Sequence, residues 1–234
     1  MVANMSGGRN TNGRARVARR RAALASQVTE RGIKVVTCNC QGFSFFKLFL
    51  LLELTSAHVL CLQETWLPKG GGMPDIPGTV HEQRRSSGKR GGFATLVKKG
   101  LQVTRVVTND YAILTDLQLP GGDKLAVVNT YLPPIASIKR KRLSDEVVQE
   151  AVCELVAKAP HDSKLAVVGD FNARTGALMP PDAEGGLTTR VSTDEMVCAR
   201  GKWLAEQWQL WACPPLNGSW DDQAGASTCL HSNG

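Results

Sequence analysis

The sequence has few aromatic residues and no paired cysteine motif. Aromatic residues make up 6% of the 234 residues, whereas hydrophobic residues of all kinds make up 42%. This apolar content is enough for the core of one large domain or of two small ones. The seven cysteines are odd in number and form no Cys-x-x-Cys pair. This pattern argues against a disulfide framework or a zinc knuckle, and it predicts a reducing compartment.

The chain also lacks an apolar run long enough to cross a membrane. The most apolar segment, 43–54, is about half of the ~20 residues that a membrane span needs, and it contains Lys47 and Glu53. We expect it to form a buried helix. No apolar stretch directly follows the early basic residues, so no secretory signal is predicted. We expect a soluble protein of the nucleus or cytoplasm, neither secreted nor bound to a membrane.

Acidic residues are almost missing from the first 34 residues. Eight lysines and arginines face one acid there, Glu30, which accounts for the whole net charge of +7. We expect residues 1–32 to form a disordered basic arm. The simplest explanation for this arm is a solvated leader. The same segment could also bind phosphate backbones or serve as a nuclear address, and these roles are compatible with disorder. Its central arginines are Arg14, Arg16, Arg19, Arg20 and Arg21.

After the arm, short β-rich runs alternate with helical patterns, which is typical of an α/β protein. Strands are predicted over 33–39, 58–64, 91–99, 101–107, 112–119, 124–133 and 164–170. Helices are predicted over 45–57, 144–159 and 192–212. We expect the strands between 91 and 119 to form an antiparallel set with one face in water. Ser144 is the predicted N-cap of the second helix, and "STDE" (192–195) the capping box of the third.

Four of the predicted strands end in polar side chains that core packing does not require. These side chains are Asn39, Glu64, Asn129, Tyr131, Asp170 and Asn172. Each of them alone has a structural explanation. The asparagines and Asp170 could be turn or cap residues, Gln63 and Glu64 could mark the point where the chain meets water, and Tyr131 could be an interfacial aromatic with a satisfied hydroxyl. Because side chains of a strand alternate between faces, Asp170 and Asn172 should project together while Phe171 points to the core. Two carboxylates with carboxamides at strand ends predict an oxygen-only site for Mg²⁺ or Mn²⁺.

Five segments occur in the order typical of one known family. "CNCQG", "LCLQETW", "GKRGGFATLV", "VVNTYLPP" and "VVGDFNART" resemble the successive motifs of the endonuclease/exonuclease/phosphatase superfamily. Within it, "ARGKWLAEQWQLWACPPLNG" and "STCLHSNG" are most similar to the apurinic-type endonuclease domains of non-LTR (LINE-like) retrotransposons. The resemblance covers residues 33–234. It implies two packed, mostly antiparallel or mixed β-sheets flanked by helices, in a four-layer α/β sandwich.

The resemblance also implies roles for the strand-end residues. Glu64 would bind the metal, and Asn39, in the same metal site, would steady Glu64. Tyr131 would contact the scissile phosphate. Asp170 would activate or orient the attacking water, with Asn172 as its partner at the transition state. The implied reaction is metal-dependent hydrolysis of a DNA phosphodiester bond, and in this family the resulting nick primes reverse transcription.

Two more residues are assigned to site support, and the chain departs from the family pattern in places. Asn129 and Thr228 are the support residues, Thr228 because the family's threonine supports a downstream aspartate. His58 and Cys198 replace an aspartate and an asparagine that are common in the family. The sequence stops at Gly234, before the family's "IDY"-like strand and Ser-Asp-His motif. We therefore expect an endonuclease-like domain that lacks its C-terminal strands, is weak or inactive alone, and belongs to a longer reverse-transcriptase polyprotein.

Basic segments outside the arm are candidates for DNA contact. They contribute Arg90, Lys139, Arg140, Lys141 and Arg142. Solvated surface loops are the alternative explanation for these charges. Two further functions remain open. One is a non-catalytic nucleic-acid-binding remnant that uses the arm, and the other is a phosphatase or phosphodiesterase of the same superfamily acting on a phosphoinositide or sphingolipid headgroup.

Overall fold

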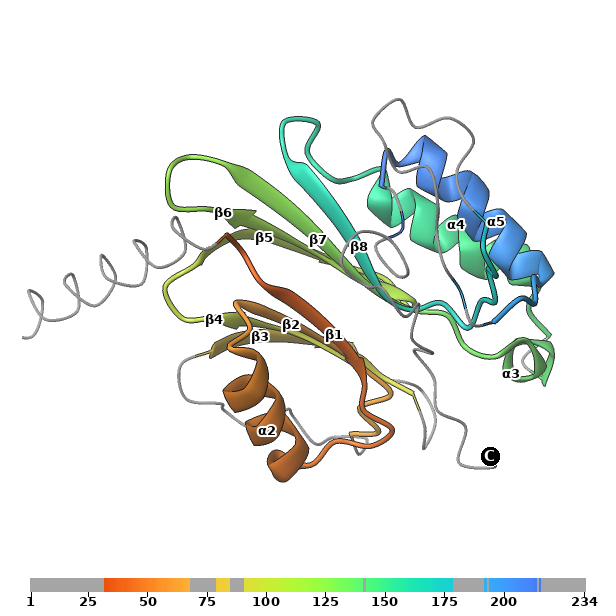
Figure 1. Cartoon of the computed structure of the whole chain (residues 1–234), viewed down its shortest axis with the longest axis horizontal. Coiled ribbons are helices and arrows are strands. Elements are labelled where there is room, and N and C mark those ends of the chain that lie inside the picture. The colour runs from red at the N-terminus through yellow and green to blue at the C-terminus, as the bar shows by residue number, and fades with distance from the viewer. Residues whose placement is uncertain are drawn as a thin grey trace, which may run out of the picture.

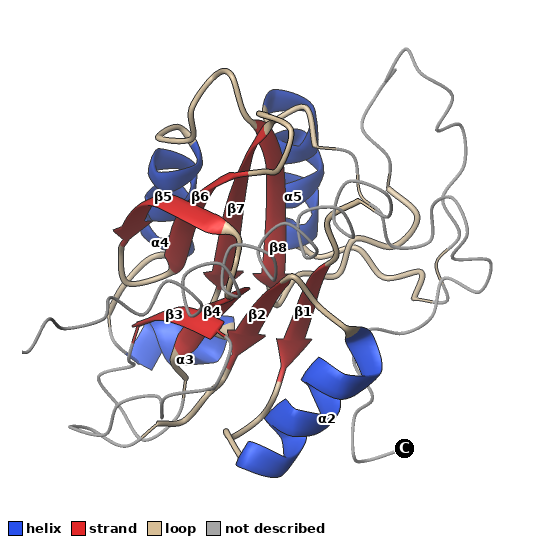
Figure 2. Ribbon diagram, turned by 90° about the vertical axis from the view of Figure 1, so that its left-hand side faces the viewer, coloured by secondary structure: helices blue, strands red, loops and turns tan. Residues whose placement is uncertain are grey.

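Two four-stranded sheets pack against each other, with helices on their outer faces (Figures 1 and 2). The computed structural model describes residues 32–67, 79–84, 91–140, 142–178, 192, 194–213 and 215. The strands are β1 Val35–Asn39, β2 Val59–Gln63, β3 Thr79–Arg84, β4 Phe93–Lys98, β5 Gln102–Thr108, β6 Ala112–Gln118, β7 Lys124–Tyr131 and β8 Lys164–Asp170. The helices are α2 Phe45–Thr55, α3 Ile135–Arg140, α4 Asp145–Val156 and α5 Ala199–Leu210.

Each sheet contains one parallel pair of strands. The first sheet has the order β1-β2-β4-β3, with β1 and β2 parallel and the other pairs antiparallel. The second has the order β5-β6-β7-β8, with β7 and β8 parallel. A parallel pair needs a crossover connection. Helix α2 lies in the connection between β1 and β2, and helices α3 and α4 lie in that between β7 and β8.

The core is divided into three apolar layers by the alternation of side chains along the strands. Val59 and Cys61 of β2 face the second sheet, where they join a cluster with Val127 of β7. Leu60 and Leu62 face the opposite way and pack with α2. The outer face of the second sheet packs against α4, which buries four residues there. The expected four-layer α/β sandwich is confirmed.

The strand over 91–99 was expected in one antiparallel set with its two successors, and this is wrong. β4 pairs with β2 and β3 in the first sheet, whereas β5 and β6 belong to the second. The expected wet face is also wrong for β4 and β6, whose residues are almost all buried. One face of each strand is covered by the facing sheet. The other face packs in the cluster with α2 for β4 and in the cluster with α4 for β6. Only β5, an edge strand, alternates between half-buried and exposed positions.

The prediction for the third helix needs correction, whereas the predicted N-cap of the second is confirmed. Helix α5 begins at Ala199, not near 192, and its N-cap is Cys198. Asp194 of the expected capping box instead pairs with Arg174. Helix α4 does have Ser144 as its N-cap, with its hydroxyl accepting from the Val147 main-chain N–H.

Helix α2 was expected to be buried, but only one of its faces is. Leu48 is 3% exposed, whereas Phe45, Phe46 and Phe49 are each more than 60% exposed. The helix lies on the outside of the first sheet, so its outer face has no layer above it within the described residues (Figure 1). Among the residues that the structure describes, no helix combines the length and the apolar character needed to cross a membrane.

Candidate active site

The carboxyl ends of four strands meet at one edge of the two sheets. In the first sheet Asn39 of β1 pairs with Gln63 of β2, and in the second Tyr131 of β7 pairs with Asp170 of β8. Both pairs are parallel, so each brings two strand ends together. β1 and β8 contact each other across the sheets and run in a similar direction in Figure 1. The predicted strand-end residues therefore come from both sheets to one place.

Asp170 lies at the centre of a hydrogen-bond network. The Asn39 side-chain amide donates to Asp170 Oδ2 at 2.7 Å, which joins the two sheets. The main-chain N–H of Asn172 donates to Asp170 Oδ1 at 2.9 Å, and its side-chain amide lies 3.3 Å from Oδ2. That amide also donates to the carbonyl of Leu132 at 2.8 Å. Both carboxylate oxygens are thus held in place from two sides.

The proximity of Asp170 and Asn172 has a different cause from the one expected. The strand ends at Asp170, and Asn172 has a left-handed backbone with φ of 45°. The two side chains meet because the chain turns back on itself with the Asp170 carboxylate as acceptor, not because strand residues alternate. Phe171 packs against the core cluster under α4, as the sequence indicated.

Glu64 and Tyr131 form a second contact between the sheets. The Tyr131 hydroxyl donates to Glu64 Oε1 at 3.2 Å. Burial raises the pKa of Tyr131 well above its usual value, and the nearby carboxylates of Glu64 and Asp170 raise it further. The phenol therefore stays protonated and remains a donor at neutral pH. Glu64 has φ of +50°, a conformation that is unfavourable for a residue other than glycine.

Beneath these groups lies a buried polar pair that sequence reasoning only half identified. Asn129 is fully buried, and its side-chain amide donates to the carbonyl of Ala94 at 2.9 Å. Its Oδ1 accepts from Gln63 Nε2 at 2.7 Å. The alternative explanation for Gln63, that the chain simply meets water there, is wrong, because Gln63 is 1% exposed. The available signal was its position, because Gln63 shares the inward face of β2 with Val59 and Cys61.

The remaining predicted residues lie elsewhere or outside the described part. Lys139 in α3 and Arg142 just after it are exposed, and α3 follows the end of β7 closely. His58 lies at the start of β2, where its Nδ1 accepts from the main chain of Lys34, and Cys198 caps α5. Outside the described residues, or with undescribed side chains, are Thr228, Arg90, Arg140, Lys141, Arg14, Arg16, Arg19, Arg20 and Arg21.

The chemistry of the donor set fits a hard divalent cation. The candidate ligands are carboxylate and amide oxygens, which suit Mg²⁺ or Mn²⁺ rather than zinc. Within the described residues, no group of three or more His, Cys, Asp and Glu side chains is placed to hold a metal. Burial raises the pKa of the nearby Cys40 thiol to about 11, so it is not a thiolate ligand at neutral pH. Mg²⁺ commonly uses one or two protein carboxylates with water and substrate phosphate, and Glu64 with the amide oxygen of Asn39 would supply such a ligand set.

The sequence profile of the Endonuclease/Exonuclease/phosphatase family matches residues 1–226. The chain belongs to this family. Its members are hydrolases that act on phosphodiester bonds, and they generally use divalent metal ions. A search of curated proteins gives no match.

Several solved structures share the fold. The catalytic domain of Xenopus laevis APE2 matches with a TM-score of 0.54 and 16% identity, over 75% of this chain and 67% of that one. The 3′ phosphatase NExo from Neisseria, bound to a product DNA hairpin, matches with a TM-score of 0.52 and 16% identity, over 76% of this chain and 71% of that one. An AP endonuclease from Archaeoglobus fulgidus matches with a TM-score of 0.51 and 16% identity, over 76% of this chain and 70% of that one. At this identity the similarity establishes the fold.

Proposed function

We propose that this chain is a Mg²⁺-dependent DNA endonuclease of the retrotransposon type. The observation that carries the proposal is the Asp170 carboxylate, held by Asn39 and Asn172 beside the Glu64–Tyr131 pair. The retrotransposon assignment is supported by the similarity of the segments 199–218 and 227–234 to LINE-like endonuclease domains. In such an element the domain would lie within a longer reverse-transcriptase polyprotein.

Each side chain of the cluster has a chemical task that follows from its contacts. Glu64 and Asn39 would hold the cation, which when bound offsets the charge on the phosphate and on the leaving oxygen. Asp170 would accept a proton from the attacking water or orient it. Tyr131, still protonated, would donate to a phosphate oxygen. Asn172 keeps Asp170 in position, because its main-chain and side-chain N–H groups donate to that carboxylate.

DNA as the substrate is supported by charge and by the structural neighbours. The neighbours include AP endonucleases and a 3′ phosphatase bound to a DNA hairpin. The first 34 residues carry the whole net charge of +7, and a basic segment of this kind suits a phosphate backbone. Lys139 and Arg142, exposed near the end of β7, would extend this contact.

A substrate panel tests the proposal and separates it from a phosphatase. The purified chain is incubated with supercoiled plasmid, an abasic duplex, DNA with a 3′-phosphate, and a phosphoinositide headgroup, each with Mg²⁺, Mn²⁺ or EDTA. Nicking of plasmid or abasic DNA that EDTA abolishes supports the endonuclease. Release of inorganic phosphate without strand cleavage would instead support a phosphatase.

The basic arm favours a second candidate function, a nucleic-acid-binding protein without catalysis. That function predicts salt-sensitive DNA binding that survives Asp170→Ala and is lost when residues 1–21 are deleted. The endonuclease predicts that Asp170→Ala removes cleavage while DNA binding persists. Measuring binding and cleavage side by side on both variants distinguishes the two functions.

A further inference from the structure

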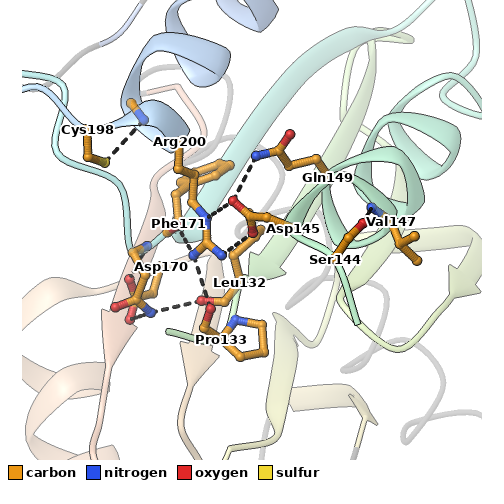
Figure 3. A network of polar contacts seen from close by, with 12 residues as sticks. Leu132, Pro133, Ser144, Asp145, Val147, Gln149, Asp170, Phe171, Cys198 and Arg200 are labelled. Carbon is orange, nitrogen blue, oxygen red and sulfur yellow. Dashed lines mark hydrogen bonds and ion pairs between the residues drawn. The ribbon is translucent and has the colours of Figure 1, made fainter. Parts of the chain in front are cut away.

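Arg200 is a fully buried arginine in the first turn of α5, and its guanidinium contacts the start of α4 and the two loops that follow β7 and β8 (Figure 3). Its guanidinium pairs with both carboxylate oxygens of Asp145, through Nη2 to Oδ1 and through Nε to Oδ2 at 3.2 Å. Its Nη1 donates to two main-chain carbonyls, those of Pro133 and Phe171, each at 3.1 Å.

The two carbonyls belong to the loops that follow the candidate catalytic residues. Pro133 comes two residues after Tyr131, and Phe171 directly follows Asp170. Arg200 therefore connects the loop after β7 to the loop after β8 with a single group. The Asn172 side chain also joins these loops, through the Leu132 carbonyl. Arg200 adds the connection to α4, because Asp145 is in the first turn of that helix.

The start of α5 is packed so that Arg200 has little freedom to move. A side chain at Gly201 would place its Cβ 1.9 Å from the carbonyl oxygen of Arg174, so the helix backbone lies directly against the segment after Asn172. The Cys198 sulfur accepts from the main-chain N–H groups of Arg174 and Gly201. Gly201, a residue type that is unfavourable inside a helix, is thus the residue that allows this close approach.

A buried ion pair alone is weak evidence for a stabilising role, because apolar residues of similar size often stabilise a core as well. The additional donors distinguish this arginine. An apolar side chain could fill the same space, but it could not bind the two loop carbonyls, and its neighbours would keep unpaired polar groups. The contacts of Arg200 therefore specify where the two loops lie, beyond any contribution to packing.

We propose that Arg200 is a positioning residue that holds the Asp170–Asn172 turn in register with the end of β7. Its effect on phosphodiester cleavage rests on the function proposed above. Its effect on the geometry of the turn is independent of that function. Arg200 itself touches neither the candidate metal ligands nor the Asp170 side chain in the described contacts, so it acts through the loop backbone.

The test compares Arg200→Lys, Arg200→Met and the double variant Asp145→Asn/Arg200→Met. The double variant removes the carboxylate that Arg200→Met would leave unpaired, and so provides a folded protein if the single variant fails to fold. The matched control is Arg105→Met. Arg105 also pairs with an aspartate, Asp116, and binds a carbonyl just beyond the other end of α4, that of Lys158.

With DNA and Mg²⁺, we expect kcat of the folded Arg200→Met or double variant to fall about 10- to 100-fold, because small displacements of catalytic groups have effects of this size. KM should stay within about twofold of the wild type, and Arg200→Lys should recover part of kcat. Arg105→Met should lower the melting temperature and leave kcat unchanged. Folded Arg200 variants that cleave with the wild-type kcat would overturn the proposal.

Hydrogen exchange provides a readout that does not need activity. The main-chain amides of Asn172 and Leu132, which donate to Asp170, should exchange faster in the Arg200→Met and double variants than in Arg105→Met. If the wild type cleaves no substrate with any metal, the proposed function fails and exchange alone decides the role of Arg200. Unchanged protection of these two amides would then overturn the positioning role.

Discussion

Asp170 and Glu64 reach the same edge of the molecule in different ways. Asp170 is fixed by donors from Asn39 and Asn172, so its carboxylate is oriented before any substrate binds. Glu64 is oriented by its backbone, which is left-handed directly after β2. The main-chain N–H of Gly42 donates to the Glu64 carbonyl, and the N–H of the next residue, Thr65, donates to the carbonyl of Gly92. Pre-oriented charges of this kind are what catalysis of phosphoryl transfer requires.

Tyr131 should titrate above the ordinary pKa of tyrosine. Burial disfavours the tyrosinate, and the negative charge of Glu64 disfavours it further. The chain has two tyrosines, so the difference in tyrosinate absorbance between the wild type and Tyr131→Phe gives the curve of Tyr131. Glu64→Gln should move that curve to lower pH. An unchanged curve in Glu64→Gln would contradict the contact between the two residues.

The same shift has a consequence for stability. The native state keeps the Tyr131 proton at pH values where the unfolded chain has lost it, so stability from this group is present below pH ~10 and is lost above it. The free energy of unfolding should therefore fall more steeply above that pH in the wild type than in Tyr131→Phe.

The protein should be more stable with glycine at position 64 than with alanine there. A positive φ disfavours any residue with a Cβ by about 1–2 kcal/mol, so we expect Glu64→Gly to exceed Glu64→Ala in unfolding free energy by about 1 kcal/mol. Urea denaturation measures the difference. The control is Glu53, a solvent-exposed residue within α2. There Glu53→Gly should be less stable than Glu53→Ala by about 1 kcal/mol. Alanine being equal or better at position 64 would contradict the strained conformation.

At the scale of single elements, Gly169 determines how β8 ends beside β7. Its φ is +136°, and a Cβ there would lie 1.9 Å from the carbonyl oxygen of Thr130. We expect Gly169→Ala to lower the free energy of unfolding by about 2–5 kcal/mol, from backbone strain and the clash together. The control is Gly121→Ala, with φ of +95° but nothing within 4 Å of the added Cβ. Equal losses at both positions would show that the close approach to β7 has no effect.

Elements with strong periodic patterns could be predicted from the sequence, and those defined by tertiary contacts could not. The strand predicted over 164–170 and the helix predicted over 144–159 come close to their structural bounds, because a short apolar run and a serine N-cap are local signals. The start of α5 could not be predicted, because its N-cap is a cysteine that binds Arg174, a residue far from it in sequence. β3 was missed because its sequence, TVHEQR, is mostly polar.

At the scale of the whole molecule, the site depends on how the two sheets pack. The sequence indicated which strand ends carry polar groups, and the family resemblance assigned their roles. The sequence could not show which of these side chains contact each other. Asn39 and Asp170 are 131 residues apart in the chain and bond across the sheets. The pairing of Gln63 with Asn129 was equally hidden, because it requires both residues to be inside.

The buried Gln63–Asn129 pair should hold the sheets in register beneath the site. Asn129→Leu would leave Gln63 and the Ala94 carbonyl without their partner, and we expect a loss of about 2–5 kcal/mol in unfolding free energy. The double variant Asn129→Leu/Gln63→Leu should recover about 1–3 kcal/mol of this loss. As a control, Arg105→Met should add to Asn129→Leu without coupling, because its bonds go to Asp116 and Lys158. Strict additivity of the Gln63 and Asn129 effects would contradict a shared network.

The central claim is that the four strand ends form a metal-dependent phosphodiesterase site, and one comparison tests it most directly. Plasmid nicking with Mg²⁺ is measured for the wild type, Asp170→Asn and Asp162→Asn. Asp162 lies just before the start of β8 and pairs with Lys124, so it is a matched change at the other end of the same strand. We predict that Asp170→Asn lowers the nicking rate about 10²- to 10⁴-fold, while Asp162→Asn keeps the wild-type rate. Nicking that depends on Mg²⁺ and is equally fast in Asp170→Asn and the wild type would contradict the assignment of the site.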